Sequence, residues 1–184
     1  MKKLVIFDLD GTLLNTIADL AHSTNYALNK LGYPTHEIEK YNFMVGNGID
    51  KLFERALPEG EKSPENVQKI RARFIPYYNL HNADLSLPYP GIPEMLEKLQ
   101  HQGFLLAVAS NKYQEATTKL IHQFFPDIRF TAILGQREGI PSKPDPQIIE
   151  EIAQKAKVSK EAIVYIGDSC VDMQTGVNAG VTTV

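Results

Sequence analysis

The stretch KLVIFDLDGT, residues 3–12, combines an apolar run with two aspartates in a turn. Residues 4–7 are all apolar and contain two adjacent β-branched residues, which is typical of a short strand buried on both faces of a parallel sheet. Asp8 and Asp10 come directly after this run, at the carboxyl end where open α/β sheets bind ligands. Two carboxylates this close repel each other unless a cation lies between them, and Mg²⁺ prefers such oxygen ligands. The stretch therefore predicts a metal site, with a plain acidic turn as the alternative.

The composition is that of an ordinary globular protein of 184 residues, 43% hydrophobic and 22% charged. This length is sufficient for one domain with a sizeable insertion. The net charge of −3 argues against a nucleic-acid partner, because such proteins usually carry clustered Lys and Arg. The single cysteine, Cys170, excludes an internal disulfide framework, and the first residues are too quickly charged for a signal peptide or a membrane span. We expect a cytoplasmic protein without a membrane partner.

Two regions with different patterns follow the first strand. Residues 15–82 contain no strand-like run, and their apolar spacing predicts helices over about residues 17–31, 47–57 and 63–78. The Pro-rich segment LPYPG, residues 87–91, is typical of a hinge. The rest alternates, with helices expected over residues 92–101, 114–124, 146–156 and 170–179, and strands over residues 104–109, 130–134, 162–166 and 181–184.

This alternation predicts an α/β fold with a Rossmann-like parallel sheet core, because strands joined by helices of this length form right-handed βαβ units. The first strand belongs to the same sheet, so the helical region is an all-helical insertion. We expect the core to hold residues 1–14 and 88–184 and the insertion to hold residues 15–87.

Polar residues follow the later strands as they follow the first. Ser110, Asn111 and Lys112 come directly after one apolar run, and Asp168 and Asp172 follow another. Lys143 stands in the loop before the helix that begins near residue 146. A hydroxyl with neighbouring N–H groups can hold phosphoryl oxygens, a lysine can neutralise them, and further carboxylates can complete a metal site. Helix caps and solvated surface charges are the alternative interpretation of each residue alone.

Taken together in this order, the motifs resemble those of the haloacid dehalogenase-like hydrolases, in particular the phosphatase branch. The matching segments are DLDGT at residues 8–12, Ser110-Asn111 after a strand, Lys143 before Pro144, and GDS at residues 167–169 with Asp172. The first and last are highly specific, and the resemblance covers nearly the whole chain. It implies a cytoplasmic, Mg²⁺-dependent enzyme acting on a small phosphorylated metabolite, as a monomer or homodimer.

The resemblance also implies a role for each motif residue. Asp8 would be the nucleophile that forms an aspartyl-phosphate, and Asp10 the general acid and base. The predicted metal ligands are Asp8, the backbone carbonyl of Asp10, Asp168 and, in support, Asp172. The residues expected to bind the phosphoryl group are Thr12, Ser110, Asn111 and Lys143.

The second aspartate separates branches of the family. Dehalogenases of this fold lack it because a halide leaving group needs no proton, so Asp10 argues for C–O–P chemistry. The insertion resembles the family's helical cap, and VGNG at residues 45–48 with ERAL at residues 54–57 is similar to the cap segment of phosphoglycolate phosphatases. Asn47 and Arg55 lie eight residues apart, opposite the apolar stripe of one predicted helix, where they could reach a small anionic substrate.

Several other functions share parts of this pattern. Within the superfamily, a nucleotidase, a pyrophosphatase, a sugar-phosphate phosphatase or a β-phosphoglucomutase remains open. A phospho-accepting signalling module of the receiver type belongs to a different class, but receivers have no helical insertion after the first strand. A catalytically silent binding protein is disfavoured by the intact set of four motifs.

Overall fold

The computed structural model describes residues 2–184, and the chain divides into two compact units. The sheet unit consists of Met1–Asn15 and Pro88–Val184, and the helical unit consists of Thr16–Leu87. A two-stranded sheet is formed by β2 (Leu14–Asn15) and β3 (Leu87–Pro88), at the two places where the chain passes from one unit to the other. Strands of two residues carry no periodic pattern, so the sequence did not predict them.

The sheet unit is built on five parallel strands in the order β5-β4-β1-β6-β7. Their bounds are β1 (Leu4–Phe7), β4 (Leu105–Tyr113), β5 (Phe130–Gln136), β6 (Ile163–Ile166) and β7 (Thr182–Thr183). The predicted α/β class and parallel sheet are confirmed. The chief difference lies in β4, which continues four residues beyond the apolar run that predicted it.

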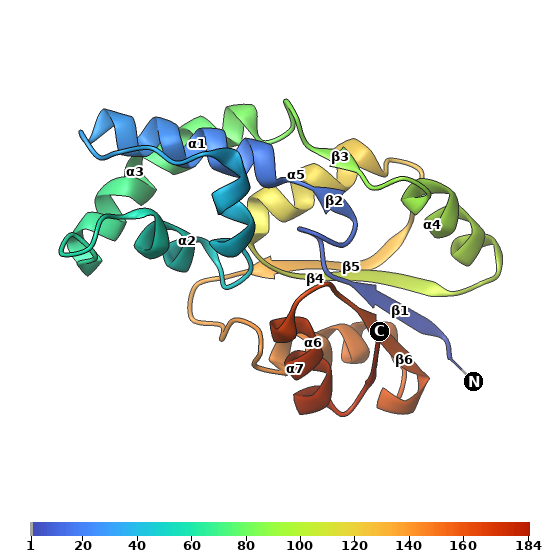
Figure 1. Ribbon diagram of the computed structural model, residues 1–184. Helices are drawn as coiled ribbons and strands as arrows, with labels where there is room; N and C mark the ends of the chain where they lie inside the picture. The colour runs from blue at the N-terminus through green and yellow to red at the C-terminus, as the bar shows by residue number, and fades with distance from the viewer. Residues whose placement is uncertain (1) are drawn as a thin grey trace. The chain divides into compact units, whose positions relative to one another are not determined.

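Helices cover both faces of this sheet (Figure 1). They are α4 (Ile92–His101), α5 (Gln114–Phe124), α6 (Gln147–Ala156) and α7 (Cys170–Ala179). Figure 1 shows α4 and α5 on one face and α6 and α7 on the other. On the α6 side, Ile149 and Ile152 belong to one buried cluster with Leu4 and Ile6 of β1. The central strand is buried on both faces, which explains its uninterrupted apolar sequence.

The strand order makes β1 the point at which the sheet stops growing on one side and continues on the other. The chain proceeds from β1 outward to β4 and β5, and then returns to the other side of β1 for β6 and β7. Residue Phe7 pairs with Val108 on one neighbour and with Ile166 on the other. Because the crevice at such a switch point is where open α/β sheets bind ligands, the residues that follow Phe7 occupy the expected position for a site.

The helical unit contains three α-helices and one 3₁₀ segment. They are α1 (Ile17–Lys30), η1 (Ile38–Phe43), α2 (Ile49–Ala56) and α3 (Pro64–His81). Ser63 caps α3 by accepting a hydrogen bond from the Asn66 N–H, and Pro64 occupies the first turn. The ring of Phe74 packs against Phe53 and Tyr78, at centroid distances of 5.0 and 4.9 Å. The segment η1 was not predicted, because six residues are too few for a helical apolar stripe.

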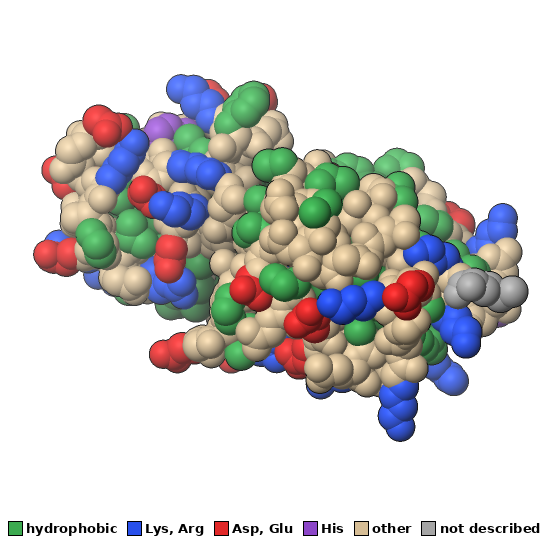
Figure 2. Space-filling view, turned by 90° about the horizontal axis from the view of Figure 1, so that it is seen from below, with side chains coloured by type: hydrophobic (Ala, Val, Ile, Leu, Met, Phe, Trp, Pro, Cys, Tyr) green, Lys and Arg blue, Asp and Glu red, His purple; other side chains and the backbone are tan. Residues whose placement is uncertain are grey.

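Charged side chains of both signs are interspersed on the surface. On the face drawn in Figure 2, Lys and Arg alternate with Asp and Glu instead of gathering in one basic patch. Within residues 2–184, no helix has the length and apolar character that crossing a membrane requires.

One buried carboxylate joins the beginning and the end of the helical unit. Asp19, in the first turn of α1, is 2% exposed. Its carboxylate accepts hydrogen bonds from the Leu85 N–H at 3.0 Å, the Ser86 N–H at 2.8 Å and the Ser86 hydroxyl at 2.6 Å. The first and last parts of the helical unit are therefore joined through a single side chain.

We predict that Asp19→Ala lowers the free energy of unfolding by about 3 kcal/mol, because it leaves buried donors without an acceptor. Asp84→Ala is the matched control, since the Asp84 side chain is 56% exposed, and it should cost about 0.5 kcal/mol or less. Urea titrations followed by circular dichroism measure both. Equal losses in the two variants would show that the Asp19 contacts contribute nothing specific.

Candidate active site

The chain makes a tight turn after β1, and this turn carries both Asp8 and Asp10. The N–H groups of Thr12, Leu13 and Leu14 all donate to the Leu9 carbonyl, which folds the chain back on itself within a few residues. Gly11 makes this turn possible with a φ of +88°, a value that favours glycine. A Cβ at this position would lie 2.3 Å from Oδ2 of Asp168. Gly11 therefore also allows the turn to lie close to the loop that follows β6.

The extension of β4 carries three of the predicted site residues in sequence. Ser110, Asn111 and Lys112 lie within the strand and are buried. Ser110 is therefore no cap for α5, whose N-cap residue is Tyr113. The Ser110 hydroxyl accepts a hydrogen bond from the Lys112 N–H at 3.2 Å. The Asn111 side chain donates to the Lys143 carbonyl at 3.2 Å and accepts from the Lys143 N–H at 2.9 Å, and so fixes the backbone of that loop.

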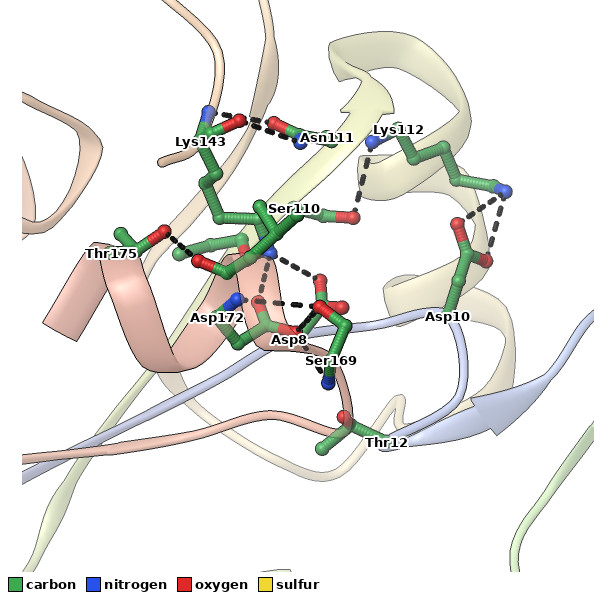
Figure 3. Close-up of polar contacts among 12 residues, drawn as sticks. Asp8, Asp10, Thr12, Ser110, Asn111, Lys112, Lys143, Ser169, Asp172 and Thr175 are labelled. Carbon is green, nitrogen blue, oxygen red and sulfur yellow. Dashed lines mark hydrogen bonds and ion pairs between the residues drawn. The ribbon is translucent and has the colours of Figure 1, made fainter. Parts of the chain in front are cut away.

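The Lys143 ammonium is the centre of the site (Figure 3). It lies 2.9 Å from Oδ1 of Asp8 and 2.7 Å from Oδ1 of Asp172. It also donates to the Ala109 carbonyl at 3.0 Å and to the Tyr165 hydroxyl at 2.9 Å. Lys143 is 5% exposed, so these partners replace the water that the charge has lost.

Asp172 holds the lysine from the helix side. Its Oδ1 accepts hydrogen bonds from Lys143 and, at 2.6 Å, from the Tyr165 hydroxyl. Its Oδ2 accepts from both the N–H and the hydroxyl of Ser169, which completes a capping box at the start of α7. Because both oxygens are engaged and the residue is fully buried, Asp172 acts here as a positioning residue for Lys143.

The carboxylates also form a group suited to a divalent cation. Asp8, Asp168 and Asp172 each offer an oxygen, and these oxygens all lie within 4.8 Å of one another. Asp168 is exposed and accepts a hydrogen bond from the Thr12 hydroxyl at 3.1 Å, which orients it. A set of two or three carboxylates at this spacing fits Mg²⁺. Both Asp172 oxygens also accept hydrogen bonds, so Asp172 would support the ligands Asp8 and Asp168.

A second ion pair lies apart from this group in Figure 3. The Lys112 ammonium donates to both carboxylate oxygens of Asp10, at 3.0 Å each. Asp10 therefore points toward β4, whereas Asp8 points toward Lys143.

Two residues of this site were not predicted from the sequence. Tyr165 was interpreted only as part of an apolar strand, and its position two residues before the Gly167-Asp168 turn was the available signal. Lys112 was noted at the end of its strand without a role, although it directly follows Ser110-Asn111.

The predicted insertion residues belong to the helical unit. The Arg55 guanidinium donates to Oδ1 of Asn47 at 2.7 Å and to the Met44 carbonyl at 2.8 Å. Asn47 and Arg55 therefore contact each other. The prediction that both lie on one helix was wrong for Asn47, because α2 begins at Ile49, after the N-cap Gly48.

Comparison with known proteins agrees with the four motifs. The family model for haloacid dehalogenase-like hydrolases matches residues 5–184. The chain belongs to this family. The phosphoglycolate phosphatase of Aliivibrio fischeri is 32% identical over 183 residues, which cover 97% of this chain and 81% of that protein. The phosphoglycolate phosphatase of Vibrio cholerae serotype O1 is 34% identical, with the same coverage of each chain.

A solved structure gives the same result. The crystal structure of a predicted phosphoglycolate phosphatase from Haemophilus somnus 129pt matches with a TM-score of 0.91 at 32% identity, over 99% of this chain and 84% of that chain. The resemblance predicted from the motifs is confirmed, and this haloacid dehalogenase-like hydrolase is a phosphoric monoester hydrolase.

Burial dominates the electrostatics of Asp8 in this hydrolase. Desolvation raises the pKa of Asp8 from 3.8 to about 6, because the Lys143 charge offsets only part of the cost of burial and Asp172 adds repulsion. Burial alone would lower the pKa of Lys143, but Asp8, Tyr165 and Asp172 together raise it. The lysine therefore stays charged at neutral pH, while the ionised form of Asp8 is destabilised.

The sign of this effect predicts how stability depends on pH. An acid whose pKa is higher in the folded state binds its proton more tightly there, so its ionised form destabilises the fold. The cost begins as pH rises through 3.8 and is complete above about 6. The difference between the two pKa values corresponds to about 3 kcal/mol.

We predict that Asp8→Asn, measured with a chelator present, raises the free energy of unfolding by about 3 kcal/mol at pH 8, because it removes this destabilising charge. The gain should shrink toward zero as pH falls to about 4. Asp127→Asn, at an exposed position, serves as the control and should change little. Denaturant titrations across this pH range test the prediction, and a less stable Asp8→Asn protein at pH 8 would contradict it.

Proposed function

We propose that this protein is a Mg²⁺-dependent phosphatase that hydrolyses a small phosphomonoester resembling phosphoglycolate, through an aspartyl-phosphate on Asp8. The observation that carries the proposal is the Asp8 carboxylate held 2.9 Å from the Lys143 ammonium at the carboxyl end of β1. A carboxylate approaches a phosphate dianion only if nearby cations cancel their repulsion. The names of the Aliivibrio fischeri and Vibrio cholerae relatives point to the same substrate class.

In the first step, an Asp8 oxygen attacks phosphorus as the bond from phosphorus to the ester oxygen breaks. Asp10 gives its proton to the departing alkoxide, which leaves as the alcohol. Ser110 and the Asn111 N–H bind the phosphoryl oxygens, and Lys143 neutralises the charge that they share with Asp8. The product of this step is the alcohol and phosphorylated Asp8.

In the second step, water attacks the same phosphorus from the side that the alcohol has left. Asp10, now a carboxylate, takes a proton from that water, and the bond between phosphorus and the Asp8 oxygen breaks. Inorganic phosphate is released and both aspartates return to their starting state. Asp10 therefore moves protons in both directions while Asp8 forms and breaks the covalent bond.

The metal completes the balance of charge. Asp8, Asp168 and the Asp10 backbone carbonyl would hold Mg²⁺, with Asp172 in support. The hydrogen bond from the Thr12 hydroxyl would orient Asp168. When bound, the ion supplies positive charge beside the phosphoryl group. We also propose that the helical unit is the cap of this hydrolase, with Asn47 and Arg55 as its candidates for substrate contact.

We predict that Asp8→Asn reduces phosphatase turnover by at least about 10³-fold, because an amide is a far weaker nucleophile than a carboxylate. Asp127→Asn, the same chemical change at an exposed site, should keep full activity. The assay measures phosphate released from 2-phosphoglycolate, a nucleoside monophosphate, a hexose phosphate and pyrophosphate, with Mg²⁺ and with a chelator. Chelator-resistant turnover, or substantial Mg²⁺-dependent turnover in Asp8→Asn, would contradict the proposal.

The same panel separates the neighbouring activities. Isomerisation of a hexose 1-phosphate without release of phosphate would favour a mutase. A phosphorylated Asp8 that persists for minutes without turnover would favour a phospho-accepting signalling module.

A further inference from the structure

Lys112 is a buried cation to which the proposed mechanism gives no role. Lys112 lies on β4 two residues after Ser110, and its side chain is 3% exposed. Its ammonium donates to both oxygens of Asp10 at 3.0 Å, as Figure 3 shows. Burying an ammonium is costly unless it is paired, and here the pairing depends on the Asp10 carboxylate.

Lys143 already supplies the ammonium that the phosphoryl group requires. It contacts Asp8 and Asp172, whereas Lys112 contacts Asp10. The two lysines therefore serve different aspartates, and Figure 3 shows them approaching the site from different directions.

The stereochemistry of the reaction places the two lysine–aspartate pairs on opposite sides of the phosphorus atom. In an in-line displacement, the leaving oxygen departs on the side of phosphorus opposite the nucleophile. Asp8 is the nucleophile, so the acid that protonates the leaving oxygen, Asp10, must reach that opposite side. Since Lys112 is hydrogen-bonded to Asp10, its charge is placed beside the leaving alcohol.

We propose that Lys112 binds an anionic group carried by the leaving alcohol and so selects phosphomonoesters with a second negative charge close to the ester oxygen. This inference rests on the proposed phosphatase function. A substrate carboxylate offers the ammonium the same two-oxygen acceptor that Asp10 offers in this structure. As the substrate carboxylate takes over hydrogen bonds from Lys112, the Asp10 carboxylate loses its counter-ion, takes up a proton from solvent and turns toward the ester oxygen as the general acid. The substrate's own charge thus frees the general acid.

A purely structural Lys112 gives a different result from a substrate-binding one. If the lysine only positions Asp10, its removal slows the reaction of every phosphomonoester by the same factor. If it binds the leaving group's anion, its removal acts on anionic substrates far more than on neutral ones. The ratio of kcat/KM between two matched substrates therefore separates the two roles.

The test compares 2-phosphoglycolate with ethyl phosphate, in which a methyl group replaces the carboxylate. In Lys112→Met, we predict that the preference in kcat/KM for 2-phosphoglycolate falls by at least about 30-fold relative to the unsubstituted enzyme, as expected for a charged hydrogen bond. Lys98→Met, which changes an exposed lysine on α4, should keep the preference. Equal losses for both substrates, or no loss for either, would overturn the proposal.

A binding measurement tests the same inference independently of turnover. In the Asp8→Asn protein, calorimetry gives the affinities for 2-phosphoglycolate and for inorganic phosphate. Adding Lys112→Met should lower the affinity for 2-phosphoglycolate by at least about 30-fold and change the affinity for phosphate by no more than about 3-fold. The retained phosphate binding also shows that the site is folded. An equal loss of affinity for both ligands would contradict the role of Lys112. Absence of turnover by the unsubstituted enzyme on every phosphomonoester would instead overturn the proposed function.

Discussion

The ion pair between Lys143 and Asp8 is the interaction on which the site depends. The ammonium is buried and lies within 3.0 Å of acceptors on β4, β6, α7 and the turn after β1. One side chain therefore ties together elements that the sequence separates widely. Because the pair is buried, its charges interact strongly, yet burial still raises the pKa of Asp8. Asp8 is held ionised at a cost in stability, which the rest of the fold offsets.

The sheet and the motif positions were predictable because they follow from local patterns. An apolar run that is buried on both faces has a clear sequence signal, and polar residues at its end mark the functional edge of the sheet. These signals placed β1, β6 and α7 within a residue or two, and they predicted that Asp8, Lys143 and Asp168 share one edge. The structure brings Asp8 together with Lys143, and the oxygens of Asp8 and Asp168 within 4.8 Å.

The remaining features depend on contacts between distant residues. In the sequence, Tyr165 is one residue of an apolar strand. In the structure its hydroxyl accepts a hydrogen bond from Lys143 and donates one to Asp172. Lys112 extends β4 beyond its apolar run, and only the fold reveals that it reaches Asp10, which lies 102 residues away in the sequence. Asp172 was predicted to support a metal, and its oxygen lies within 4.8 Å of those of Asp8 and Asp168. Its hydrogen bonds with Lys143, Tyr165 and Ser169 were not predicted.

The proposed mechanism requires Asp8 to carry the phosphoryl group during turnover. Acid quenching within the first turnover, followed by peptide mass spectrometry, measures this directly. We expect the peptide containing Asp8 to gain the mass of one phosphoryl group, on Asp8, and to lose it again when substrate is exhausted. A phosphoryl group on Ser110 or another side chain, or no phosphorylated peptide under conditions where phosphate is released, would contradict it.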